Sequence, residues 1–264
     1  EVGGDINQID ILDSAISQSD YVIHLAALWL LQCRDFPRAA FKVNIEGAFN
    51  VLELCGKHKI KKLVYSSSAS VYGDAQEVPM TEQHPFNNRN FYGATKIAGE
   101  AMCRAFYERY GLNYVGLRYM NVYGPRQDEK GVYTGVIPIV LNKIEAGEAP
   151  VVFGDGTQSY DFVYVKDVAR ANVLALKSKA TDEFFNVGTG VQVSIKELCE
   201  TLLKLKNSNL EIIYKPYVGD DSRALVKNRV GDPQKAEKLL NFKYQYSLEQ
   251  GLRELIQWRK KQAN

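Results

Sequence analysis

The chain has 264 residues, of which 45% are hydrophobic and 24% are charged, and these proportions are typical of a globular protein. Its net charge of +2 gives no reason to expect binding to nucleic acid or to a membrane surface, and no apolar run approaches the length of about 18 residues that a membrane-spanning helix needs. Four cysteines without a CxxC pair and three scattered histidines predict buried, reduced thiols, a cytoplasmic location and no metal site.

Strand and helix patterns alternate along the first half of the chain. Short apolar runs predict three buried strands, at residues 21–27, 62–65 and 113–117. Helical periodicity predicts helices over 37–57 and 92–110, the second of which ends at Gly111. Because short apolar strands alternate with helices long enough for crossovers, we expect a parallel sheet with helices on both faces.

The pattern changes after Gly124 and Pro125, where glycines and prolines interrupt the chain up to residue 160. Ser194 is suited to cap a further helix, and Glu197 stands at the capping-box position. The other elements expected in this half are helices over 137–145, 168–178 and 248–262 and strands over 161–165 and 184–188. We therefore expect a second, smaller α/β unit here.

Three short segments lie at the carboxyl ends of predicted strands. They occupy positions 26–27, 66–68 and 119–121. The carboxyl ends of parallel strands meet at one edge of the sheet, and ligands bind in the crevice beyond that edge. The three segments therefore predict a binding site at this edge.

Tyr92 and Lys96 are four residues apart in a predicted helix, which places them on one face. A tyrosine titrates near a pH of about 10, and a fixed cation beside it favours the phenolate. One of the hydroxyls at 66–68 can then pass on a proton taken from a substrate alcohol. The pair alone also fits a surface helix that carries the two residues by chance, but the serines at the end of the preceding strand favour a catalytic site.

These motifs together resemble the extended short-chain dehydrogenase/reductase family, and within it the NAD-dependent nucleotide-sugar epimerases of the UDP-glucose 4-epimerase type. The resemblance extends over essentially the whole chain. The segments that carry it are GDI (4–6), HLAA (24–27), Asn44, SSSASVYG (66–73), YGATK (92–96), LRYMNVYGPR (117–126), GDGTQSYDFVYVKDVA (154–169) and FNVGTG (185–190).

The resemblance implies an α/β fold with a doubly wound, parallel Rossmann-type sheet and a smaller α/β substrate domain. Residues 1–124 would bind NAD, and residues 125–264 would bind a nucleotide sugar, most simply a UDP-sugar, with 160–190 returning to the Rossmann sheet. The family opens with a strand and a Gly-rich GxxGxxG turn that holds the pyrophosphate. We therefore expect that the sequence given is N-terminally incomplete and that this unit lies before Glu1.

The resemblance also assigns catalytic roles. Tyr92 would be the acid/base, Lys96 would hold the nicotinamide ribose and depress the pKa of Tyr92, and Ser68 would bridge Tyr92 and the sugar hydroxyl. The implied cofactor-binding residues are Asp5 and Ile6 at the adenine, Leu25, Ala26 and Ala27 along the pyrophosphate, Asn44 by the nicotinamide half, and Ser66, Tyr92, Lys96 and Tyr119.

The substrate side is implied in the same way. The residues are Ser68, Asn121 at the diphosphate, Val136, Phe153 and Phe162 around the nucleotide, Tyr160 and Arg223. Taken singly, each of Val136, Phe153 and Phe162 fits an ordinary core or loop residue equally well. Tyr160 replaces the family's phosphate-binding arginine, and Tyr217 replaces a second one. Arg223, Arg229 or Arg126 can supply the missing charge, and Arg223 is our candidate.

The implied reaction is epimerisation at C4. The Tyr92 phenolate would remove the proton of the sugar 4-hydroxyl while NAD takes the hydride, and the 4-keto sugar would turn over and receive the hydride on its other face. The family's 4,6-dehydratases carry an Asp-Glu pair just after the catalytic hydroxyl, and its UDP-glucuronate decarboxylases keep the Glu. Ala69 and Ser70 stand there, which favours epimerisation or a simple 4-oxidation or reduction.

Two other functions stay open from the sequence. One is a nucleotide-sugar reductase that releases NAD(P)H, and the other is a non-catalytic protein that binds a nucleotide sugar. Members of the family pair through two helices that correspond to 37–57 and 92–110, so we expect a homodimer. The alternative is that both helices are buried within one subunit.

Overall fold

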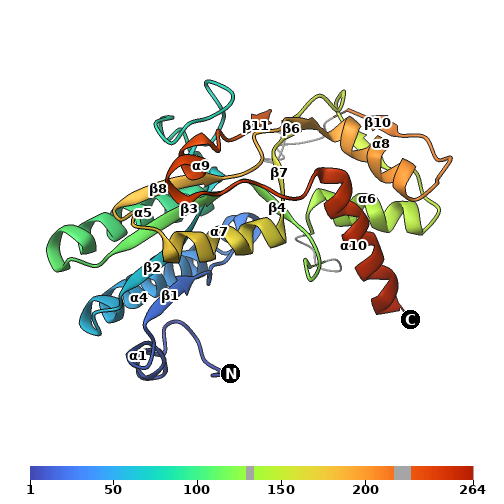
Figure 1. Cartoon of the computed structure of the whole chain (residues 1–264). Coiled ribbons are helices and arrows are strands. Elements are labelled where there is room, and N and C mark those ends of the chain that lie inside the picture. The colour runs from blue at the N-terminus through green and yellow to red at the C-terminus, as the bar shows by residue number, and fades with distance from the viewer. Residues whose placement is uncertain (129–133, 217–226, 264) are drawn as a thin grey trace.

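The structure is a computed structural model that describes residues 1–128, 134–216 and 227–263, so Arg223 lies outside the described residues (Figure 1). Its centre is a parallel sheet of four strands in the order β1-β2-β3-β8. Their bounds are Tyr21–His24 (β1), Lys62–Ser68 (β2), Tyr114–Tyr119 (β3) and Glu183–Val187 (β8). The pairing of β8 with β3 joins residues from the second half of the chain to the sheet built by the first half.

Helices cover both faces of this sheet. On one face lie α4 (Gly47–Lys57) and α5 (Phe91–Tyr110), whose apolar residues form one core with Leu63 and Tyr65 of β2. On the other face lie α7 (Val165–Lys177) and α9 (Gln234–Leu240). Their apolar residues form a core with Val64, which stands between Leu63 and Tyr65 in β2. Alternate residues of a strand point to opposite faces, so an unbroken apolar strand contributes side chains to the hydrophobic core on each face of the sheet. The predicted α/β class with a doubly wound parallel sheet is confirmed.

The predicted helix over 92–110 is confirmed as α5. The Asn90 side chain accepts a hydrogen bond from Gly93 N at its start, and Gly111 ends it with a φ of 68° in the left-handed region. The predicted helical segment 37–57 is confirmed, but it is not one regular α-helix. The segment is α3 (Pro37–Ala40), a π-helical stretch at Phe41–Glu46, and then α4.

Two strand boundaries differ from the predictions because pairing, not apolarity, sets them. β1 ends at His24, the last residue in register with β2, and the chain then leaves the sheet. β2 continues through the serines, because Ser66, Ser67 and Ser68 pair with the end of β3. The serines therefore belong to the strand itself and lie at its carboxyl end.

The rest of the chain folds around a second core. Its helices are α6 (Val136–Glu145), α8 (Ile195–Leu205) and α10 (Leu248–Ala263). Three small sheets accompany them: β5 (Val151–Phe153) with β10 (Ile213–Lys215), β4 (Asn121–Tyr123) with β7 (Phe162–Tyr164), and β6 (Ser159–Tyr160) between β9 (Val193–Ser194) and β11 (Asn228–Arg229). The predicted capping box of Ser194 and Glu197 is present at the start of α8.

Short elements complete the fold: α1 (Ile9–Ser17), α2 (Leu30–Asp35) and a 3-10 turn at Ala69–Val71. Among the residues described, no helix is both long and apolar enough to cross a membrane. No cluster of three or more His, Cys, Asp or Glu suited to a metal ion occurs in the same ranges. All four cysteines are buried free thiols.

Candidate active site at the carboxyl ends of the strands

Gly93 allows the start of α5 to lie against the turn that follows β2. A Cβ at this position would stand 2.5 Å from the carbonyl oxygen of Ser70 and 2.1 Å from Asn88 Oδ1, so only glycine fits. This close approach brings Tyr92 to the end of β2, close enough to the Ser68 hydroxyl for that hydroxyl to lower the pKa of its phenol. The sequence prediction that the serines and Tyr92 share one site agrees with this geometry.

Lys96 lies one turn further along α5 and is almost fully buried, with 4% of its surface exposed. Its Nζ donates a hydrogen bond of 2.7 Å to the Ser66 carbonyl oxygen and stands 5.6 Å from the centre of the Tyr92 ring. Burial lowers the pKa of the Lys96 ammonium to about 8. Lys96 is therefore still mostly protonated at neutral pH.

The pKa of Tyr92 is raised to about 12, chiefly because burial disfavours the phenolate. The nearby Ser68 hydroxyl and the positive charge of Arg229 act in the opposite direction but do not outweigh burial. The expectation that Lys96 depresses this pKa below its ordinary value was therefore wrong for this structure. The Lys96 ammonium is directed to the Ser66 carbonyl, and the Tyr92 hydroxyl is protonated at neutral pH.

Ser66 and Tyr119 are held in a chain of hydrogen bonds behind Lys96. The Ser66 hydroxyl lies 3.0 Å from the Tyr119 hydroxyl, which donates to Asn172 Oδ1 of α7 over 2.9 Å. Both residues thus fix the position of the strand ends as well as lining the predicted cofactor site. Buried His24 lies near Lys96, and burial followed by the Lys96 charge lowers its pKa to about 4, so its imidazole is neutral.

Asn44 connects three parts of the site. Its amide exchanges hydrogen bonds of 2.7 and 2.8 Å with the backbone of Leu28, and it donates to Thr95 Oγ1 of α5 over 3.0 Å. It lies in the π-helical stretch, a type of segment that is frequent at functional sites. The structure therefore shows Asn44 as a clamp between the loop after β1 and α5.

The remaining predicted cofactor residues lie along the edge of the fold near β1. The Asp5 carboxylate is exposed and accepts a hydrogen bond from Asn7 N, while Ile6 packs against Gly47, where a Cβ would approach Ile6 Cγ2 to 2.6 Å. Residues 25–27 form the loop after β1. In this loop Leu25 and Ala26 are exposed and Ala27 is half-buried.

The predicted substrate residues divide between surface and core. Asn121 opens β4, Val136 opens α6, and Phe153 ends β5 with 45% of its surface exposed. Phe162 instead is buried in the second core, where its ring packs edge-to-face on that of Tyr160 at 6.1 Å. For Phe162 the core alternative that the sequence left open describes its environment.

Arg229 lies much closer to the predicted catalytic groups than its place in the sequence indicates. It pairs with Tyr160 in the β11–β6 register. The guanidinium of Arg229 lowers the pKa of Tyr92, and Tyr92 raises the pKa of Arg229. Its Nε is buried without a hydrogen-bond partner in the described part of the chain. The sequence favoured Arg223 over Arg229 and Arg126, whereas the pairing of two distant strands places Arg229 here.

A family model described as the NAD dependent epimerase/dehydratase family matches residues 2–188. The chain belongs to this family.

Three comparisons illustrate the range of the epimerase/dehydratase family around this chain. A Methanocaldococcus jannaschii protein with the provisional name UDP-glucose 4-epimerase is 39% identical over 98% of this chain and 83% of its own length. A UDP-N-acetyl-α-D-glucosaminuronate decarboxylase from Bacillus cytotoxicus is 32% identical over 95% of this chain and 81% of its own. The UDP-glucose 4-epimerase of Thermotoga maritima, solved with UDP-glucose, has a TM-score of 0.92 and 34% identity, covering 99% of this chain and 84% of that one.

The donor set of this epimerase/dehydratase fits the family's NAD. An ammonium has three N–H donors, and Lys96 makes a single hydrogen bond within the described residues, to Ser66. Its other donors are suited to a ribose diol, and the Tyr92 ring lies beside it. The predicted family membership and cofactor are thus confirmed at the level of the family.

An ion pair in the core of this epimerase/dehydratase fastens α5 to the sheet. Arg118 of β3 donates to both carboxylate oxygens of Glu100 over 2.9 and 2.7 Å, and Ser67 donates to the same carboxylate over 2.5 Å. Arg118 also donates to the Tyr72 hydroxyl. Glu100 follows Lys96 by one turn, so this network holds the helix that carries Tyr92 and Lys96, the predicted catalytic side chains. The sequence analysis did not identify it.

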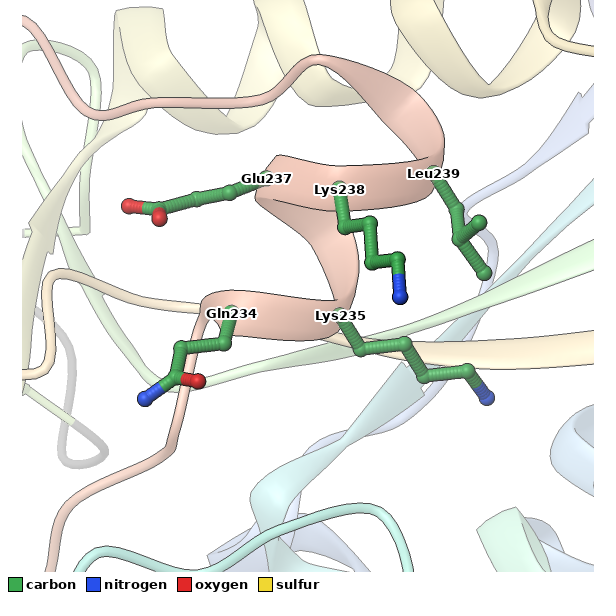
Figure 2. A pocket seen from close by; sticks show the side chains of 5 residues that line it. All are labelled: Gln234, Lys235, Glu237, Lys238 and Leu239. Atoms are coloured by element: carbon green, nitrogen blue, oxygen red, sulfur yellow. The ribbon is translucent and has the colours of Figure 1, made fainter.

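A surface hollow beside α9 is unrelated to this site (Figure 2). All of its lining residues come from that one short helix: Gln234, Lys235, Glu237, Lys238 and Leu239. Lys235 bonds Glu183 and the Phe184 carbonyl at the amino end of β8, whereas the catalytic residues lie at the carboxyl ends of the strands.

Proposed function

We propose that this member of the family epimerises a UDP-sugar at C4 through a transient 4-keto intermediate. The observation that carries the proposal is the convergence of Tyr92, Ser68 and Lys96 at the carboxyl end of β2. Under this proposal Tyr92 is the acid/base, Ser68 relays or shares the proton, and Lys96 holds the cofactor. The coarser activity, a nucleotide-sugar conversion of the epimerase/dehydratase type, follows from the family and from its relatives.

The chain's own groups move the proton. Ser68 orients the 4-hydroxyl toward Tyr92, and Tyr92 takes its proton in the phenolate form, which the positive charge of Arg229 favours although burial keeps its population small at neutral pH. NAD, when bound, would supply the hydride chemistry at C4, and Lys96 would hold its ribose. Tyr92 then gives the proton back to the oxygen at C4, so no proton is gained or lost over the cycle.

The residues after Ser68 support epimerisation over the other reactions in the family. Elimination of water and loss of carbon dioxide require an additional acid or base close to the sugar. Ala69 and Ser70 are both buried and carry no carboxylate. This favours the epimerase proposal even though a decarboxylase is among the relatives.

We propose that residues 1–124 bind NAD and that 125–264 bind the nucleotide sugar, with 160–190 shared between the two units. Asn121, Val136, Phe153 and Tyr160 would meet the diphosphate and the nucleotide. Their places at the first or last positions of short elements beyond the sheet support this role. We also propose a homodimer formed through the helical segment 37–57 and α5, supported by large exposed aromatic side chains there, such as Phe41 and Phe49.

The substitution Tyr92→Phe tests the mechanism. We expect the full-length protein with NAD to interconvert UDP-glucose and UDP-galactose, or the corresponding uronates, without added cofactor. Removal of the hydroxyl should lower kcat by about 10²-fold to 10⁴-fold and leave UDP-sugar binding intact. Tyr110→Phe, at the exposed far end of the same helix, is the control and should not change kcat.

The same assay separates the alternatives. An active Tyr92→Phe enzyme would overturn the assignment of Tyr92. A stoichiometric change in nicotinamide absorbance during turnover of the wild-type protein would identify a reductase. UDP-sugar binding with neither bound NAD nor turnover would identify a non-catalytic binding protein.

A further inference from the structure

Arg229 is a half-buried cation whose Nε is fully buried, and it forms no ion pair with the residues that the structure describes. Its Nε has no hydrogen-bond partner, and no acidic side chain in the described residues lies within ion-pair distance of it. The charged or titratable groups that act on it are Tyr160, Asp74 and Tyr92, and burial nevertheless lowers the pKa of its guanidinium. An unpaired charge inside a protein is costly, so a group that stays buried in this way is suited to an anion that arrives from outside.

Backbone hydrogen bonds tie Arg229 to the catalytic edge of the sheet. Asp161 N donates to the Arg229 carbonyl over 2.9 Å, and Asn121 N donates to the Asp161 carbonyl over 2.9 Å. Asn121 follows by two residues Tyr119, which pairs with Ser68 in the sheet. β6 and β11 lie side by side in Figure 1. A short series of backbone contacts therefore connects Arg229 to Ser68 at the end of β2.

The position identifies which part of a substrate Arg229 would meet. Under the proposed function, on which this inference rests, Tyr92 reacts with the sugar hydroxyl, and the β11–β6 pairing with its backbone hydrogen bonds places Arg229 beyond the same strand ends, on the side of the sugar ring. A neutral hexose offers only hydroxyls to a guanidinium. A carboxylate on the ring offers two oxygens in the planar arrangement that the guanidinium fork binds best.

We propose that Arg229 binds a carboxylate carried by the sugar ring, and that the enzyme therefore prefers an acidic nucleotide sugar of the UDP-uronate class. Tyr92, at the carboxyl end of β2, and Arg229, at the end of β11, then contact the same sugar. The carboxylate neutralises the cation, and the guanidinium fixes the orientation of the ring.

Calorimetry on the full-length, NAD-loaded protein tests this with three probes: UDP, UDP-glucose and UDP-glucuronate. We expect the wild-type protein to bind UDP-glucuronate about 10-fold to 100-fold more tightly than UDP-glucose, the range for a charge-assisted hydrogen bond. Arg229→Gln should abolish this preference by weakening UDP-glucuronate alone. Arg229→Lys, which keeps the charge but not the fork, should retain part of it. Arg253→Gln, on the exposed face of α10, is the matched control and should change nothing.

Several outcomes would overturn the inference. Equal wild-type affinity for UDP-glucose and UDP-glucuronate would do so without any variant. Equal weakening of all three probes by Arg229→Gln would show that Arg229 meets the diphosphate instead. A lower melting temperature of unliganded Arg229→Gln would indicate a structural role, because loss of an unpaired buried charge should leave stability equal or higher. Failure of wild-type protein to bind either UDP-sugar would contradict the proposed function itself.

Discussion

The buried pair of Glu100 and Arg118 allows a quantitative test of how α5 is held. The two side chains are 4% and 5% exposed, and the carboxylate receives hydrogen bonds from Arg118 Nε, Arg118 Nη2 and Ser67 Oγ. Glu100→Gln keeps the shape but removes the charge, which leaves the Arg118 guanidinium in the core without a counter-ion.

Breaking a buried pair by removal of one partner costs about 3–5 kcal/mol. Arg118 keeps its hydrogen bonds to the Tyr72 hydroxyl and the Glu82 carbonyl, so we expect a loss near the lower end, about 3 kcal/mol. At about 2–4 °C per kcal/mol for a chain of this size, the melting temperature should fall by roughly 6–12 °C.

The assay is denaturant and thermal unfolding of the wild-type protein and Glu100→Gln. Glu249→Gln is the matched control, because Glu249 pairs with Arg253 on the exposed face of α10, and it should change the free energy of unfolding by less than about 1 kcal/mol. The double variant Glu100→Leu/Arg118→Met should recover part of the loss, since it removes both charges. A cost for Glu100→Gln no larger than that of the control would refute this account of the pair.

Two further predictions follow. Burial lowers the pKa of Lys96 from 10.5 to about 8. Between these two pH values the unfolded chain binds more protons than the folded protein. The free energy of unfolding should therefore rise by about 3 kcal/mol as the pH increases through this range. Unfolding measured from pH 7 to 10.5 should show this rise in the wild-type protein but not in Lys96→Met. The same dependence of stability on pH in both proteins would contradict the prediction. For the proposed dimer, sedimentation of the wild-type protein should give twice the chain mass of 29.7 kDa. Phe49→Glu should dissociate the dimer, whereas Leu239→Glu, on the exposed surface of α9, should not. A monomeric wild-type protein would exclude the dimer.

Local features of the sequence predicted much of the catalytic site. Strand and helix periodicity located β2 and α5, and the i, i+4 spacing placed Tyr92 and Lys96 on one face. These are short-range properties, because a helix needs only its own residues to bring the two side chains together. The serines were assigned to the right edge for the same reason, although β2 proved longer than its apolar run.

The electrostatic state of the site could not be predicted in this way. The sequence indicated a lysine that stabilises a phenolate, whereas burial raises the pKa of Tyr92 and Lys96 is directed to the Ser66 carbonyl. Burial depends on everything packed around a group, so spacing alone cannot give its sign or size. The clamp role of Asn44 and the core position of Phe162 were also hidden, since their partners come from other elements.

The sequence by itself therefore determined the family, the fold class and the identity of Tyr92, Lys96 and Ser68 as the chemical candidates, because short motifs within single elements carry that information. Only the tertiary structure decided which charges surround them. The Glu100–Arg118 pair joins a helix to a strand, and Arg229 reaches the site because β11 pairs with β6, almost 70 positions earlier in the chain. Charges act through space, so their effect appears only when distant segments have been brought together.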